Sequence, residues 1–189
     1  NRILIEQDIA VGVMAKDSIY RAGVVVSNID SKKTFLQLID NKILHPRLIN
    51  LIVSLRPSSS MYIGYVALKH ALDYRLERGI THWFINDYDI GKVYENVARC
   101  KLTFDWMAIR IAQDGKKMEI FTIAPLENDA YWRKNDLAWK EGLIKKASSI
   151  IPNFLSSIDF LFTANPRAIM RWTANCDGAT CGWESTPGQ

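Results

Sequence analysis

The chain has 189 residues and a formal net charge of +4; 48% of its residues are hydrophobic and 23% are charged. This composition is typical of a globular domain with a sizeable core, and basic residues alternate with acidic ones, which argues against the basic stripe of a nucleic-acid-binding protein. No apolar run reaches the ~18–20 residues that span a bilayer, the start has no signal-peptide pattern, and the odd number of cysteines predicts a reducing, cytoplasmic setting.

The first thirty residues predict a short β-meander. Residues 2–6, 10–15 and 20–28 are rich in β-formers, and the last of these runs is continuously apolar from Val24 to Val26, which is typical of a strand covered on both faces. Asp30 or Ser31 can then cap a helix. Pro46 suits the first position of the next helix, which the proline and serines after Arg56 would end.

The remainder alternates strands with helices. Strands are expected at 60–68, 81–86, 102–112, 117–125 and 157–164, and helices at 87–100, 128–151 and 166–173. Asp114-Gly115 predicts a hairpin turn, and Gly64 suggests a bulge or the close approach of a ligand or backbone. Because several strands follow one another without long crossovers, we predict an α+β fold: a mixed, mostly antiparallel sheet with helices packed on one face, preceded by the meander.

The sequence offers little catalytic chemistry. His45, His70 and His82 share no ligand spacing, and there is no Cys-x-x-Cys pair, nucleophile elbow or phosphate loop. Asp87 and Asp89 are better explained as helix caps than as a calcium loop, which would need further spaced acidic ligands. We therefore predict no metal site and no catalytic residue in this chain.

The strands carry many aromatic side chains, and these suggest a binding surface. Tyr62, Tyr65, Trp106 and Phe121 would form the wall of a site for a lipophilic ligand if one face of the sheet were left uncovered by helices. The alternative is that these residues are ordinary core. A non-enzymatic module that binds lipid or a partner protein through the same face also remains open.

Three stretches go beyond general pattern. They are AVGVMAKDSIYRAGVVVSNIDSKKTFLQLI, RPSSSMYIGYVAL and TANPRAIMRWTANCDGATCGWESTPGQ, at 10–39, 56–68 and 163–189. In order, they resemble segments of FAD-dependent phytoene desaturases, carotenoid isomerases and retinol saturases, of the amine-oxidase superfamily. The last stretch matches the family pattern at Pro166, Arg171, Thr173, Asn175, Gly178, Ala179, Gly182 and Trp183.

The resemblance implies an inner portion of a larger flavoenzyme. Residues 1–30 would be the meander tail of an FAD-binding domain, 31–175 a substrate-binding domain, and 176–189 the start of a return crossing. The parent would bind FAD and desaturate, saturate or isomerise a polyene-like substrate, with peripheral membrane contact where that substrate lies in a bilayer. Ser27 and Asn28 would lie nearest the cofactor. The chain itself lacks glycine-rich FAD segments, so we expect it to bind no FAD and to be inactive alone.

Overall fold

The fold begins with a three-stranded antiparallel ribbon, in a computed structural model that describes residues 1–72, 75–86 and 88–186. Its strands run in the order β1 (Arg2–Glu6), β2 (Ile9–Ala15) and β3 (Ser18–Arg21). Gln7 and Asp8 take positive φ angles of 48° and 64°, as the tight turn of a right-twisted hairpin requires. Gly12 allows close pairing, because a Cβ there would collide with the carbonyl oxygen of Tyr20.

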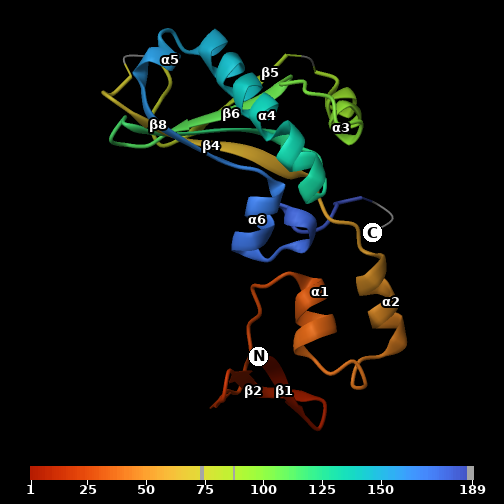
Figure 1. The fold of residues 1–189 in the computed structure, drawn as a ribbon. Helices are drawn as coiled ribbons and strands as arrows, with labels where there is room; N and C mark the ends of the chain where they lie inside the picture. Colours follow the sequence, from red (N-terminus) through yellow and green to blue (C-terminus); the bar gives the residue numbers. More distant parts are fainter. Residues whose placement is uncertain (73–74, 87, 187–189) are drawn as a thin grey trace.

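Short helices follow the ribbon and form a small lobe with it (Figure 1). They are α1 (Ser31–Lys33), a π-type turn η1 (Thr34–Leu38) and α2 (Pro46–Ser54). The Asp30 carboxylate accepts hydrogen bonds from the backbone amides of Lys32 and Lys33, at 2.9 and 3.4 Å, which confirms the predicted cap. Helix α2 begins at Pro46, as the sequence predicts, with the His45 ring accepting from the Arg47 amide.

The larger lobe is built on a five-stranded sheet in which every pair is antiparallel. Its order is β5-β6-β7-β4-β8, with β4 (Ser60–Leu68), β5 (Thr81–Ile85), β6 (Trp106–Ile111), β7 (Lys117–Ala124) and β8 (Ile158–Ala164). Its helical segments are α3 (Ile90–Ala98), α4 (Asp129–Ile150), α5 (Phe154–Ser157), α6 (Pro166–Thr173) and η2 (Cys176–Gly178). The predicted α+β fold, with its antiparallel sheet, helices and leading meander, is confirmed.

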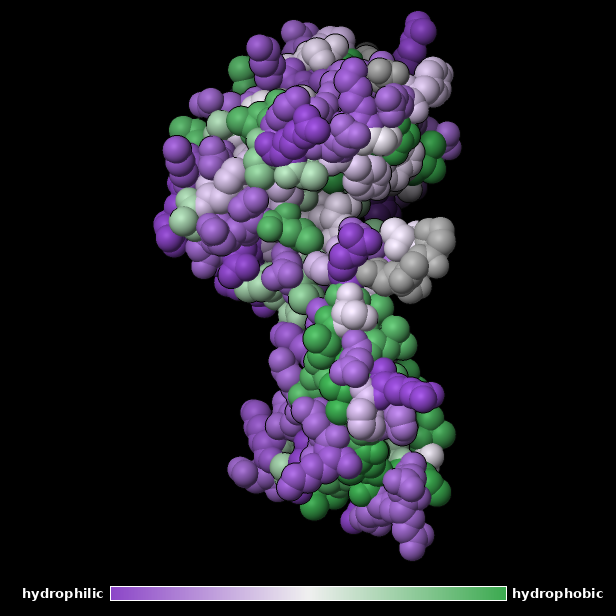
Figure 2. Space-filling view, turned by 90° about the vertical axis from the view of Figure 1, so that its right-hand side faces the viewer, coloured by the Kyte–Doolittle hydropathy of each residue, from purple (hydrophilic) through white to green (hydrophobic). Residues whose placement is uncertain are grey.

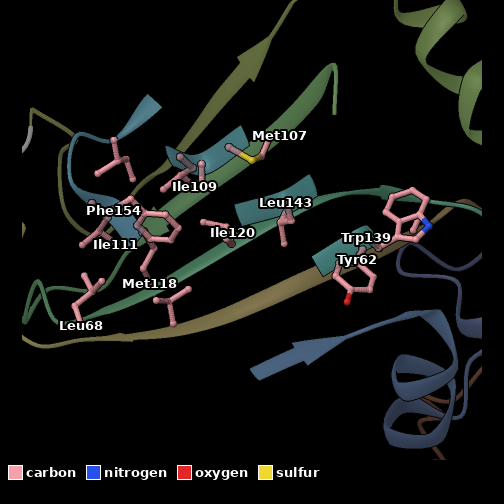
Figure 3. Close-up of a cluster of buried hydrophobic side chains, with 14 of the residues drawn as sticks. Tyr62, Leu68, Met107, Ile109, Ile111, Met118, Ile120, Trp139, Leu143 and Phe154 are labelled. Atoms are coloured by element: carbon pink, nitrogen blue, oxygen red, sulfur yellow. The ribbon is translucent and has the colours of Figure 1, made fainter. Parts of the chain in front are cut away.

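The core lies between the sheet and α4 (Figure 3). Alternate strand residues point to this side and are buried, among them Tyr62, Leu68, Met107, Ile109, Ile111, Met118 and Ile120. They pack against Trp139 and Leu143 of α4 and Phe154 of α5. Gly64 belongs to the same face. The register beside it is regular, and a Cβ there would lie 2.9 Å from Cγ1 of Ile120 and 3.3 Å from Cδ2 of Leu143. The glycine therefore makes room for core side chains, and no bulge or ligand accounts for it.

Two local expectations meet different outcomes. The Asp114-Gly115 hairpin is confirmed: Gly115 has a φ of 69°, and the Asp114 carboxylate accepts from the amides that follow. The strand expected at Val24–Val26 does not form, and β3 ends at Arg21. Val24 and Val26 are 77% and 88% exposed, because no neighbouring strand in the described part of the chain pairs with them.

Two chain segments join the lobes and run antiparallel. Pro57 faces Trp183 in an isolated bridge, and the Ser58 amide donates to the Gly182 carbonyl at 2.9 Å. The Trp183 indole N–H donates to the Ser31 hydroxyl, so the second segment also holds the start of α1. Figure 2 shows a narrow waist at this junction, with hydrophobic residues gathered on the small lobe below it.

Among the described helices none combines the length and hydrophobicity that a membrane crossing requires. The division into residues 1–30, 31–175 and 176–189 stays a prediction.

Candidate ligand-binding face

The side of the sheet away from α4 carries mainly aromatic and aliphatic side chains. Strand register brings them together, because Phe121 of β7 lies between Ile63 of β4 and Ala108 of β6, and Trp83 of β5 pairs with Ala108. We call this surface the open face and define it by Ile63, Tyr65, Trp83, Trp106, Phe121, Phe160 and Phe162.

Three rings form a cluster on the β5–β7 side of the open face. The ring centroids of Trp83 and Trp106 are 4.7 Å apart, Phe121 lies edge-on to Trp83 at 5.8 Å, and Trp106 and Phe121 are separated by 6.2 Å. These separations are within the range of favourable aromatic contacts. Helix α3 borders the cluster, with Val93 packing in the same group as Trp106. Trp83 nevertheless stays 52% exposed.

A second row of rings follows the β4–β8 side. Tyr65 and Phe162 stack with centroids 6.3 Å apart, and Phe162 stacks in turn on Trp172 of α6 at 5.8 Å. Phe160, two residues before Phe162 on β8, is also exposed. Helix α6 therefore borders this row as α3 borders the first, and rings of both rows remain partly exposed.

A hollow of about 680 Å³ lies at one end of the open face. Tyr65 and Phe160 supply apolar lining. Arg110 of β6 and Glu119 of β7, which lie opposite each other in the strand register, supply charged groups. Burial and the nearby Glu119 carboxylate raise the pKa of the Tyr65 phenol, so its hydroxyl stays neutral and can donate a hydrogen bond. The hollow thus combines apolar walls with a few polar groups, as small-molecule sites do.

Of the four aromatic residues predicted to line a site, three share the open face: Tyr65, Trp106 and Phe121. Tyr62 points to the opposite side and is 0% exposed. Its ring stacks on Trp132 with centroids 5.7 Å apart, and its hydroxyl donates to the backbone carbonyl of Asp136 at 3.0 Å. Burial raises the pKa of the Tyr62 phenol. This residue is part of the core beneath α4, and the ligand roles of the other three stay predictions.

The sequence reasoning missed four members or neighbours of this surface: Trp83, Phe160, Phe162 and Trp172. Each lies in a predicted strand or helix, so the missing information was the pairing of the strands. Once β5 is placed beside β6 and β8 beside β4, strand alternation puts Trp83 and the two phenylalanines on the same side as Tyr65.

Ser27 and Asn28, predicted to lie nearest a flavin, are on an exposed extended segment before α1. The Ser27 hydroxyl shares a 2.7 Å hydrogen bond with that of Thr34, which is buried in η1. Helix α1 has three residues and no glycine-rich strand–helix turn precedes it in the described chain, so these residues do not form a dinucleotide cradle by themselves. Their cofactor role stays a prediction.

Candidate chemistry outside the open face is sparse in the described ranges. No group of three or more His, Cys, Asp or Glu side chains there is arranged to hold a metal ion. Asp89 caps α3 by accepting from the Lys92 amide, in agreement with the capping interpretation, whereas Asp87 lies outside the described residues. Burial, together with a hydrogen bond to Glu127, raises the pKa of the Cys100 thiol, which disfavours a nucleophilic thiolate.

Comparison with known proteins gives a similar fold and no family. No protein-family model matches the sequence, and no curated protein matches it. A solved structure of an oxidoreductase from Methanosarcina mazei is similar, with a TM-score of 0.50 and 19% sequence identity. The match covers 87% of this chain and 36% of that protein, so the chain spans about a third of its length. At this identity the likeness shows a related fold.

Proposed function

We propose that this chain is the substrate-binding portion of a larger FAD-dependent oxidoreductase of the phytoene-desaturase type, acting on a lipophilic, polyene-like substrate. The observation that carries the proposal is the open face. A partly exposed sheet surface with two rows of aromatic rings, one bordered by α3 and the other by α6, suits an elongated apolar molecule that lies flat against the rings. The sequence resemblance supports the family, and the oxidoreductase neighbour supports the reaction class.

The small lobe supports the idea that this portion works beside another body of protein. Val24 and Val26 are largely exposed, and Leu51 and Val53 of α2 are exposed as well. Apolar surface of this extent commonly marks an interface. The antiparallel crossing segments at Pro57 and Trp183 tie this lobe to the sheet, as expected for a domain inserted into another.

In this proposal the chain's own residues position the substrate and exclude water from it. Bound FAD, held mostly by residues outside this chain, would supply the redox chemistry. The rings of Trp83 and Phe121 would contact the polyene, and the neutral Tyr65 hydroxyl beside Arg110 and Glu119 would orient a polar end. None of these residues is required to act as a general acid or base.

Binding of a fluorescent tetraene, cis-parinaric acid, tests the substrate surface. We expect saturable fluorescence enhancement with the chain, weakened at least several-fold by Trp83→Ala and by Phe121→Ala. Tyr20→Ala removes an exposed ring from β3 and is the matched control, expected to bind normally. Binding that is absent, or that all three variants weaken equally, would refute the assignment of the open face.

The cofactor prediction needs a separate measurement. Because the described residues form no dinucleotide cradle, the purified chain is expected to carry no flavin, and a stoichiometric flavin absorbance would contradict this. Sequencing the coding region upstream of Asn1 tests the parent: an open frame encoding a strand and G-x-G-x-x-G supports the flavoenzyme.

The second candidate is a non-enzymatic lipid- or protein-binding module. The observation that favours it is that both aromatic rows consist of this chain's own strand and helix residues and are partly exposed. An in-frame stop shortly before Asn1, combined with tetraene binding, would support this candidate over the flavoenzyme. Co-sedimentation with liposomes tests membrane contact by either form, and a chain that stays in the supernatant would exclude it.

A further inference from the structure

A polar cleft of about 360 Å³ separates the start of α4 from α6, on a part of the molecule that the proposed function does not use. Its α4 wall consists of Asp129, Trp132, Arg133 and Asp136. These positions are three or four residues apart, so they form one stripe along the first two turns. The Asn128 side chain caps the helix here, so the positive end of the α4 dipole lies at this cleft.

The facing wall comes from the beginning of α6. It consists of Asn165, Arg167 and Arg171. Asn165 caps α6 and donates through Nδ2 to the Asp136 carboxylate at 2.8 Å, and Arg167 donates through Nε to the Asp129 carboxylate at 2.7 Å. These two contacts lock the walls together. The first turns of two helices, of 22 and 8 residues, therefore meet at one place.

The charges in the cleft are not balanced. Three arginines against two aspartates leave a formal charge of +1. Arg167 holds Asp129, and with Arg133 and Arg171 it lowers the pKa of the Asp129 carboxyl, so this group is ionised at neutral pH. Within the described ranges, no hydrogen bond or ion pair occupies the guanidinium groups of Arg133 and Arg171, which leaves two planar sets of donors for an incoming anion.

A buried donor at the same place also lacks an acceptor. Trp132 borders the cleft and is only 2% exposed, yet its indole N–H has no hydrogen-bond partner in the described part of the chain. An indole nitrogen can only donate, and a buried donor without a partner is rare in folded proteins. This observation is independent of the helix ends and the arginines. An acceptor oxygen bound in the cleft would satisfy the indole N–H after a small movement of the wall that exposes the nitrogen.

We propose that this cleft binds a phosphoryl group. The two guanidinium groups supply several donors, the unpaired Trp132 indole lies beside them, and the positive ends of two helix dipoles add to the local field. This combination suits the several oxygens and the charge of a tetrahedral phosphate better than a planar carboxylate. The phosphoryl group belongs either to a soluble phosphoester or to a phospholipid headgroup.

The experiment is a titration of the isotope-labelled chain with inorganic phosphate at constant ionic strength, followed by NMR through the tryptophan indole resonances. The Trp132 signal is assigned by its loss in Trp132→Phe, provided that the circular dichroism of this variant matches the parent. We expect the Trp132 signal to move and saturate while the signal of Trp83, on the open face, stays in place. A Trp132 signal that does not move at millimolar phosphate overturns the proposal.

Arginine variants test whether the cleft itself binds. Arg171→Gln should weaken phosphate binding about tenfold, because a charge-assisted hydrogen bond and one positive charge are lost. Arg47→Gln removes an equal charge from exposed α2 in the small lobe and should leave the affinity unchanged. Equal weakening by the two variants would mean that phosphate responds only to net charge, which also overturns the proposal.

Vesicles identify the source of the phosphoryl group. Co-sedimentation with phosphatidylcholine vesicles that contain phosphatidic acid, but not with pure phosphatidylcholine, supports a headgroup if Arg171→Gln abolishes it and Arg47→Gln does not. Saturable phosphate binding without vesicle binding supports a soluble phosphoester. Both outcomes are independent of tetraene binding, so failure here and failure of the proposed function are distinguishable.

Discussion

Gly142 lies in the middle of α4, where helix propensity alone favours alanine. Replacing glycine by alanine in an exposed helix interior stabilises a protein by about 1 kcal/mol. Here, however, a Cβ would lie 2.5 Å from Cζ of Phe104 and closer still to Cε2 of the same ring. The Phe104 ring in turn packs edge-on against Trp139, with centroids 5.6 Å apart. The two effects oppose each other, so their magnitudes decide the sign.

The steric term should be the larger. Non-bonded carbons prefer separations of ~3.5–4.0 Å, so the nearest carbons of the Phe104 ring would have to shift by more than about 1 Å. Trp139 is fully buried and blocks part of that movement. Overpacking of this kind costs about 1–3 kcal/mol. Helix propensity returns about 1 kcal/mol of this cost, so Gly142→Ala should lower the free energy of unfolding by a net amount of about 1 kcal/mol. This corresponds to a fall of roughly 2–4 °C in the thermal unfolding midpoint.

Urea unfolding followed by circular dichroism measures this difference. A double-mutant cycle with Phe104→Leu isolates the clash: Gly142→Ala should be much less harmful, or stabilising, when the ring is gone, with a coupling of about 1 kcal/mol or more. The reasoning is refuted if Gly142→Ala stabilises the parent chain, or if the two substitutions are additive.

Three further predictions concern single groups. Iodoacetamide at mildly alkaline pH should alkylate exposed Cys181 before Cys100, because burial and the Glu127 carboxylate raise the pKa of the Cys100 thiol. Mass spectrometry of the adducts gives the order of alkylation, and the reverse order would contradict the prediction. Arg167→Gln should raise the pKa of Asp129 toward its ordinary value, because Arg167 lowers that pKa in the native chain. The stabilisation from this pair is therefore present above the unfolded pKa of ~3.9. It is lost as the pH falls through the lower native pKa. Urea midpoints at a series of pH values should therefore converge for the two proteins in acid, and a constant gap would count against the pair. Trp183→Phe removes the indole hydrogen bond to Ser31 at the start of α1 and should lower the free energy of unfolding in urea by about 0.5–1.5 kcal/mol. No loss would show that this contact is not needed.

Local chemistry was enough to predict most elements from the sequence. Asp30 and Asp89 cap helices, Pro46 opens α2, and Asp114-Gly115 makes a hairpin, because each of these effects depends on a few neighbouring residues. The order of elements, and from it the α+β class, followed from the alternation of strand and helix periods.

The failures involve partners distant in the sequence. A continuously apolar run such as Val24–Val26 becomes a strand only if other strands pair with it, and the run itself does not reveal them. Tyr62 and Tyr65 are three residues apart on β4, so strand alternation already required opposite faces, and grouping them contradicted a rule available at the outset. Which of the two would face α4 could not be deduced, because that depends on where the helix packs.

The two faces of the sheet make different demands on similar residues. Beneath α4, Tyr62 and Trp139 are fully buried, and the one phenolic hydroxyl among them has a backbone acceptor, as a core requires. On the open face, Trp83 and Phe162 contact other rings yet keep about half of their surface exposed. Exposed apolar surface does not stabilise the folded state, so stability alone does not explain why these rings are large. Truncating a ring on the open face should therefore disturb ligand binding more than stability, and truncating one beneath α4 should do the reverse. That asymmetry separates a binding surface from a second core.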